Sequence, residues 1–117
     1  MINLWAETTS KLNDINKTWD DVLYVYGTDF QISKENFKEV AKRTFYDDGY
    51  GSSEVPYDLK LYGHGFILCR HEHDGAEWWK AIDTSEPMYL PIEEVKILAY
   101  GHVTLTEIKE LGSKYDN

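Results

Sequence analysis

The chain has 117 residues, 42% of them hydrophobic and 15% aromatic, which predicts one folded domain over residues 1–117 whose core needs neither disulfides nor metal. Its single cysteine excludes an internal disulfide, and no apolar run approaches the ~20 residues of a transmembrane helix. The 21 acidic and 12 basic residues give a net charge of −9, a sign that repels nucleic acid and anionic membranes and excludes both as expected partners.

The first half of the chain alternates between helical and strand patterns. Residues 2–13 place apolar side chains at near-helical spacing, and residues 22–26 are rich in β-branched and aromatic side chains, which favours a strand. A turn then leads to a short returning strand over 30–32. Ser33 precedes the clearest helical pattern and is expected to cap a helix over 34–45. The N-terminus lacks the basic and apolar regions of a signal peptide, which favours a cytoplasmic protein.

The middle of the chain is dominated by β patterns separated by loops. Glycines, serines and a proline predict a loop over 46–56, which a short strand over 59–62 follows. Asp74-Gly75 lies between two β-rich runs and predicts a type I′ turn, because both central residues of that turn need positive φ. We therefore expect a hairpin of strands 66–73 and 76–83.

Beyond the hairpin, the sequence predicts a loop over 84–91 and a strand over 94–100. Thr104 and Glu107 have the spacing of a capping box, which opens a last helix that we expect to end at Gly112. The order of elements predicts an α+β fold. It would consist of a small, mostly antiparallel sheet of about four to six strands, with two or three helices packed on it.

The two-residue turn fixes which hairpin residues face each other. One face carries Phe66, Leu68, Arg70, Glu72, Glu77, Trp79 and Ala81, and the other carries Ile67, Cys69, His71, His73, Trp78, Lys80 and Ile82. We expect the open end to lie in the core and the turn to project into solvent. Arg70 is placed to stack on Trp79. Glu72 and Glu77 oppose each other, so they need a cation, which Arg70, a metal ion or a partner's lysine could supply.

His71 and His73 share a face with the spacing of a strand-borne His-x-His metal site. A zinc site needs three or four ligands, so His64, His102 or an acidic residue would have to complete it. A small metal-dependent hydrolase using these histidines and nearby carboxylates is therefore an alternative function. The competing interpretation is a solvated hairpin tip with His71 packed on Trp78.

Cys69 and His71 could form a nucleophile and its base, but two residues along one strand are too far apart for a direct hydrogen bond. The chain has no glycine-rich phosphate loop, nucleophile elbow or zinc-knuckle spacing. We predict no cofactor and no catalytic residue.

Acidic and aromatic residues are interleaved in the predicted 46–56 loop. Residues 44–100 hold 11 acids against 4 bases, so most of the net charge lies in this part of the chain. The loop lacks the phasing of an EF-hand, whereas aromatics among acids are typical of a contact surface. The candidate binding residues are Tyr46, Asp47, Asp48, Tyr50, Glu72, Glu77, Trp78 and Trp79. Whether the loop and the hairpin tip form one surface is open from sequence.

Three segments, Thr18–Val25, Tyr46–Gly51 and Arg70–Trp79, together resemble a family of sequences. It consists of uncharacterised small acidic proteins carried by phages, plasmids and conjugative elements of Firmicutes bacteria, in which a YDDGYG loop precedes an ERHEYDGSEWWE-like hairpin. The resemblance covers roughly residues 18–83. His73 stands where the family pattern has tyrosine, and Lys80 where it has an acid. The resemblance implies a genomic setting and no catalytic residues.

These observations favour a non-enzymatic protein of a mobile element. We expect a protein-binding module or inhibitor that docks an acidic aromatic surface on a basic, nucleic-acid-binding partner protein. A structural, homo-oligomeric assembly factor is a further alternative, since the sequence leaves the oligomeric state open.

Overall fold

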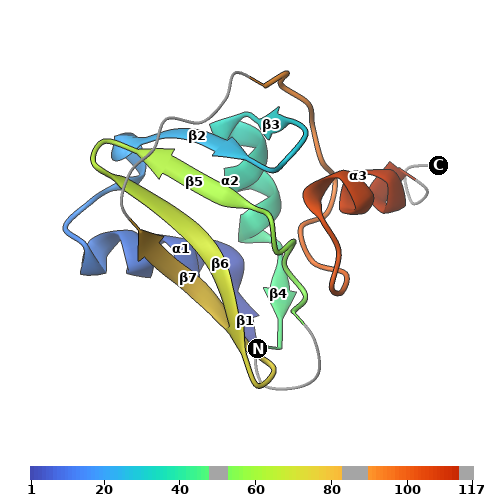
Figure 1. Ribbon diagram of the computed structural model, residues 1–117, viewed down its shortest axis with the longest axis horizontal. Helices are drawn as coiled ribbons and strands as arrows, with labels where there is room; N and C mark the ends of the chain where they lie inside the picture. The colour runs from blue at the N-terminus through green and yellow to red at the C-terminus, as the bar shows by residue number, and fades with distance from the viewer. Residues whose placement is uncertain (48–52, 83–89, 114–117) are drawn as a thin grey trace.

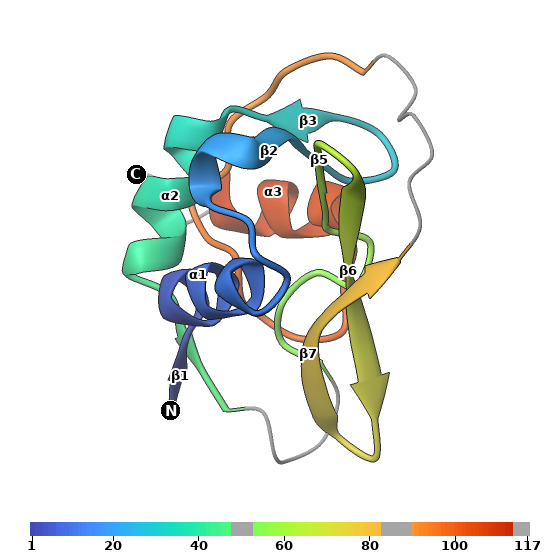
Figure 2. The ribbon, with the colours of Figure 1, turned by 90° about the vertical axis from the view of Figure 1, so that its left-hand side faces the viewer.

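An antiparallel sheet and three α-helices make up the protein in the computed structural model, which describes residues 1–47, 53–82 and 90–113. Figure 1 looks onto the sheet, and Figure 2 shows the helices on one side of it. This architecture confirms the predicted α+β fold class. Within the described ranges, no helix has the length and apolar character needed to cross a membrane.

The main sheet has five strands, in the spatial order β3, β2, β5, β6, β7, and every neighbouring pair is antiparallel. The strands are β2 (Val22–Tyr26), β3 (Gln31–Ile32), β5 (Lys60–Gly63), β6 (Phe66–His73) and β7 (Ala76–Ile82). The β6–β7 hairpin has the predicted register throughout. Asp74 and Gly75 adopt the positive φ angles, 52° and 84°, that its two-residue turn requires.

The remaining elements lie outside the main sheet. In chain order they are β1 (Ile2–Asn3), α1 (Leu4–Asp14), a 3-10 turn (Trp19–Asp21), α2 (Lys34–Lys42), β4 (Phe45–Tyr46) and α3 (Leu105–Ser113). β1 and β4 pair in a two-stranded antiparallel sheet. α1 and α2 cover one face of the main sheet, and α3 lies near the β2–β3 turn, where Leu105 approaches Gly27 (Figures 1 and 2).

α3 extends one residue beyond its predicted end, to Ser113, and the other two predicted helices differ more at one boundary. The first begins at Leu4 instead of residue 2, because Asn3 caps it by accepting the backbone N–H of Ala6 on its side-chain oxygen. The second ends at Lys42 instead of residue 45, because Phe45 and its neighbour pair with β1. In both cases a strand pairing with a distant part of the chain competes with local helical spacing.

The predicted strand over residues 94–100 is wrong, since the described residues of this segment form no strand. Val95 and Leu98 are buried, so the apolar residues that suggested a strand fill the core from an irregular segment. The backbone of Val95 is bonded through both its N–H and its carbonyl to the side chain of Asn36 on α2. A side chain therefore satisfies polar groups that a strand would have satisfied by pairing.

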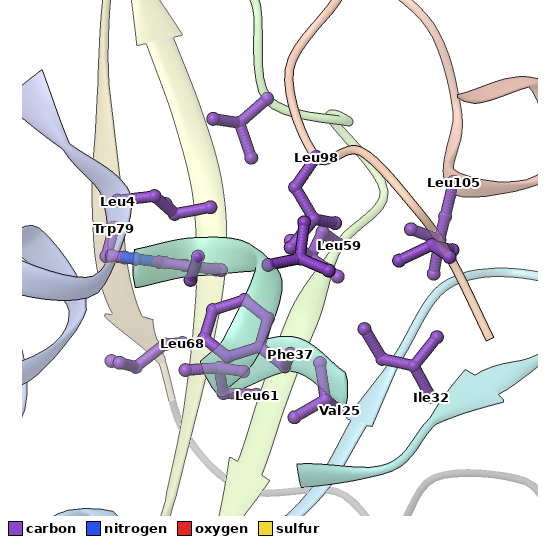
Figure 3. Close-up of a cluster of buried hydrophobic side chains, with 14 of the residues drawn as sticks. Leu4, Val25, Ile32, Phe37, Leu59, Leu61, Leu68, Trp79, Leu98 and Leu105 are labelled. Atoms are coloured by element: carbon purple, nitrogen blue, oxygen red, sulfur yellow. The ribbon is translucent and has the colours of Figure 1, made fainter. Parts of the chain in front are cut away.

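The hydrophobic core lies between the sheet and the helices. Figure 3 shows its side chains converging: Leu4 comes from α1, Phe37 from α2, Leu61 and Leu68 from the central strands, and Trp79 from β7. All five are buried. The core therefore extends to the last strand of the sheet and anchors α1 against the hairpin.

The hairpin follows the predicted gradient along β6, where residues 66–68 at the open end are buried on both faces and residues 71–73 next to the turn are exposed. β7 departs from this gradient, because Glu77 and Trp79 on one face are buried although they lie close to the turn, whereas Trp78 on the other face is exposed. The reason is that α1 covers the first face along β7. There Trp79 Nε1 donates a hydrogen bond of 2.9 Å to Thr8 Oγ1.

Candidate functional site

A buried charge network, which we call the Arg70 network, joins α1, β4 and the hairpin. It consists of Arg70, Glu7, Tyr46 and Glu77. The Arg70 guanidinium lies 3.1 Å from a Glu7 oxygen and 2.9 Å from a Glu77 oxygen, and it donates to the Tyr46 hydroxyl at 3.0 Å. The Tyr46 hydroxyl donates in turn to Glu7 at 2.6 Å. Arg70 also lies over the Trp79 ring, with 4.8 Å to its centroid, which confirms the predicted stacking.

The opposed glutamates of the hairpin have separate partners. Arg70 pairs with Glu77, so of the three cations that the sequence left open, the arginine is the one beside this glutamate. Glu77 also accepts the backbone N–H groups of Glu54 and Val55. Glu72 lies at the surface and accepts the N–H of Ser53 at 2.9 Å. Both glutamates therefore tie the segment that follows residues 48–52 to the hairpin.

Burial and charge set the protonation states of the Arg70 network. Burial raises the pKa of Tyr46 above its usual value, and the nearby Arg70 only partly opposes this. For Arg70, burial lowers the pKa, but Glu7, Tyr46 and Glu77 together raise it more. At neutral pH the network thus contains a charged guanidinium and a neutral phenol.

We expect alkaline conditions to destabilise the protein partly through Tyr46. Because its pKa is raised in the folded state, folded protein keeps the phenol proton at a pH where the unfolded chain has released it. The associated stability is complete below about pH 10 and falls as pH rises further. Thermal melts between about pH 8 and 12 should show a shallower alkaline decline for Tyr46→Phe than for wild type. The exposed control Tyr24→Phe should keep the wild-type slope; equal slopes for all three proteins would contradict this expectation.

Acidic and aromatic residues, all exposed except the half-buried Glu54, come together near the turn end of the hairpin. We call this set the acidic tip surface, and it comprises Asp47, Glu54, Tyr57, Glu72 and Tyr100. Asp47 donates its N–H to a Glu54 side-chain oxygen at 2.8 Å, and Tyr100 donates its N–H to the Glu54 carbonyl at 2.9 Å. Tyr57 and Tyr100 are 46% and 53% exposed. The chain on both sides of residues 48–52 thus lies at this end of the molecule (Figures 1 and 2).

The His102 ring contacts both Tyr57 and Glu72 of the acidic tip surface. The ring stacks on Tyr57, with 4.5 Å between centroids and 22° between planes. Its Nδ1 lies 3.0 Å from Ser53 Oγ and 3.9 Å from a Glu72 oxygen. Ser53 and Glu72 therefore approach the same ring nitrogen, whereas an acid–base triad uses one nitrogen for the nucleophile and the other for the carboxylate. This geometry positions Tyr57 beside Glu72 and does not form a catalytic triad.

The structure separates the eight candidate binding residues. Asp47 and Glu72 belong to the acidic tip surface, whereas Trp78 lies on the outward face of the hairpin. Tyr46, Glu77 and Trp79 are buried, with at most 2% of each exposed, so they support the surface from within. Asp48 and Tyr50 lie outside the described residues.

The histidines of the hairpin lie at the surface. His71 packs edge-on against Trp78, with 4.9 Å between centroids, and His73 lies beside Asp74, with 3.3 Å between Nε2 and Oδ2. Among the residues that the structure describes, no three His, Cys, Asp or Glu side chains are grouped to hold a metal ion. Burial raises the pKa of the Cys69 thiol, which keeps it protonated and weakly nucleophilic at neutral pH.

Comparisons of the chain with protein-family models, curated protein sequences and solved structures found no match. Glu54 lies in the predicted 46–56 loop, whose interleaved acids and aromatics indicated a contact surface, whereas no sequence pattern joined Tyr100 to it. Tyr57 is one of the aromatics interleaved with acids, but Tyr100 joins them only because the irregular 94–100 segment returns to Glu54.

Proposed function

We propose that the protein is a protein-binding module that recognises a basic partner surface through the acidic tip surface. The observation that supports this most directly is the convergence of Asp47, Glu54 and Glu72 at one end of the molecule, beside two exposed tyrosines. Carboxylates steer and orient a basic partner, and tyrosine supplies contact area at low entropic cost. This combination is typical of a binding surface.

The Arg70 network supports the acidic tip surface in two ways. Its guanidinium is buried and paired with Glu7 and Glu77, so it does not neutralise the carboxylates of the acidic tip surface. Glu77 also holds the backbone of Glu54, which fixes one of those carboxylates relative to the hairpin. A surface fixed before binding loses less conformational entropy when a partner docks.

The partner class follows from charge. We propose a nucleic-acid-binding protein, on which the carboxylates would take the place of phosphates, so that the module acts as its inhibitor. The resemblance to proteins of mobile elements and the charge of −9 both support such a partner. We place this activity in the cytoplasm as part of the same proposal.

Removing two charges from the acidic tip surface should weaken capture of the partner. The test compares immobilised wild type with Asp47→Asn/Glu72→Gln, which keeps side-chain acceptors, in bacterial lysate at about 50 and 500 mM salt. We expect wild type to retain a basic protein at low salt and lose it at high salt, and the double variant to retain at least about tenfold less. Mass spectrometry identifies and quantifies the bound proteins.

A matched variant controls for net charge. Glu35→Gln/Glu39→Gln removes two exposed carboxylates from α2, far from the hairpin tip in Figure 2, and should bind like wild type. If both double variants lose the partner equally, net charge and not the acidic tip surface governs binding. A salt-insensitive partner, or none with wild type, would also contradict the proposal.

A further inference from the structure

The two edges of the main sheet differ in whether another part of the described chain covers them. At the β3 edge, Gln31 donates its N–H to the Pro91 carbonyl at 2.8 Å and accepts the Glu93 N–H at 2.7 Å, so chain covers that edge. β7 is the terminal strand at the other edge, and no described strand pairs with its outer side. Figure 2 looks toward this edge, and no described helix or strand crosses in front of it.

The hairpin register shows which backbone groups of β7 point outward. His73 and Ala76 flank the two-residue turn and form a hydrogen-bonded pair, and bonded and non-bonded pairs alternate along antiparallel strands. Glu77, Trp79 and Ala81 therefore occupy non-bonded positions, with N–H and C=O directed away from β6. None of these groups is hydrogen-bonded to another described residue. Such an edge is a template for a further strand.

We infer that β7 pairs antiparallel with β7 of a second copy of the chain, about a two-fold axis at Trp79. Trp79 is the midpoint of β7, so this register pairs all of its residues. The bonded positions would be Trp79 opposite its own copy and Glu77 opposite the second copy's Ala81. The two five-stranded sheets would then join into one continuous sheet.

The side chains of β7 favour this register. Trp78 would lie opposite the second copy's Lys80 in a close, non-bonded pair, which gives a cation–π contact twice across the axis. Trp78 is already 37% exposed on the outward face, and Lys80 is exposed beside it. A two-fold axis at Lys80 would instead oppose two lysines, and an axis at Trp78 would leave the end of the strand unpaired.

Charge explains why a second copy can approach although each chain carries −9. The one carboxylate of β7 is Glu77, which is buried and paired with Arg70 at 2.9 Å. The outward side chains of β7 that flank the axis are Trp78, Lys80 and Ile82. The outward face of β7 therefore carries no carboxylate, and the one net negative charge of the Arg70 network, which has two carboxylates and one guanidinium, lies on the inward side.

Molar mass measured against concentration tests the pairing. We expect light scattering and sedimentation equilibrium to show wild type converting from monomer to dimer as concentration rises. Trp78→Lys opposes two lysines, and Lys80→Glu removes both cation–π contacts, so each should raise the dissociation constant by at least about tenfold. Wild type that stays monomeric at millimolar concentration overturns the inference, as does a dimer that neither substitution weakens.

Mixing the two variants tests the register itself. When a Trp78→Lys chain pairs with a Lys80→Glu chain, the introduced lysine of the first lies opposite the introduced glutamate of the second. At the symmetric position, the native Lys80 of the first chain lies opposite the native Trp78 of the second. The equimolar mixture should therefore form a heterodimer more tightly than either variant dimerises alone. Failure of the mixture to associate, with both variants folded by circular dichroism, excludes the Trp79-centred register.

Hydrogen exchange provides a readout that needs no substitution. In concentrated wild type the amides of Glu77, Trp79 and Ala81 should exchange more slowly than in dilute protein. The amides of Trp78 and Lys80 are already bonded to β6 and should change little. Uniform slowing along β7, or no slowing at the first three amides, counts against strand pairing.

Discussion

Replacing Arg70 by methionine is expected to lower the free energy of unfolding by about 3–5 kcal/mol, because it leaves buried charge without its cation. Glu77 is 2% exposed and would lose the guanidinium 2.9 Å from its oxygen. Glu7 and Tyr46 would lose hydrogen bonds from the same group. Urea denaturation followed by circular dichroism measures the loss. For a domain of ordinary stability this is a large share of the total.

Arg43→Met is the matched control for this substitution. Arg43 pairs with Glu39 at 3.5 Å on the surface of α2, where both side chains are more than half exposed. Exposed pairs contribute little, so the loss should be at most about 1 kcal/mol. If Arg70→Met and Arg43→Met are equally stable, the Arg70 network does not support the fold in the way its geometry indicates.

Replacing Trp79 by alanine should cost about 3–5 kcal/mol, whereas the same change at the neighbouring Trp78 should cost about 1 kcal/mol or less. Trp79 is 1% exposed, donates to Thr8 and lies against Arg70, so its removal opens a cavity and breaks two polar contacts. Trp78 is 37% exposed on the outward face. The two substitutions remove identical atoms one residue apart. The difference between their losses of unfolding free energy therefore shows which face of the hairpin is buried.

Urea denaturation of both tryptophan variants should be measured in dilute protein, where the chain is monomeric. This condition keeps loss of dimer contacts at Trp78 out of the comparison. Equal destabilisation by the two substitutions would mean that the hairpin packs with both faces half-buried.

Local chemistry was enough to predict the hairpin, but not which of its faces is inside. The Asp74-Gly75 turn needs only its own backbone preferences, and the register follows from it. The inward face, however, carries Arg70 and Glu77, and charged residues such as these are ordinarily expected at the surface. They are buried because Glu7, 63 residues before Arg70, completes their ion pairing. No local pattern indicates a partner so far along the chain.

The acidic tip surface, too, was predictable from local sequence only in part. Asp47 and Glu54 were recognisable from their interleaving with aromatics, but the sequence left open whether their loop meets Glu72 on the hairpin. Tyr100 was not recognisable, because residues 94–100 have the composition of a strand and the segment is irregular. Its position depends on a backbone hydrogen bond to Glu54, 46 residues earlier, which spacing alone does not reveal.

The long reach of the Arg70 network has a consequence for the order of folding. The hairpin closes only a two-residue turn, so it can form early, whereas the bond from Arg70 to Glu7 closes a loop of about sixty residues. We therefore expect α1 to dock late, when its glutamate meets an arginine that the hairpin has already placed. Early in folding, Arg70 is an uncovered cation beside the acidic turn, and docking of α1 completes both its burial and its neutralisation.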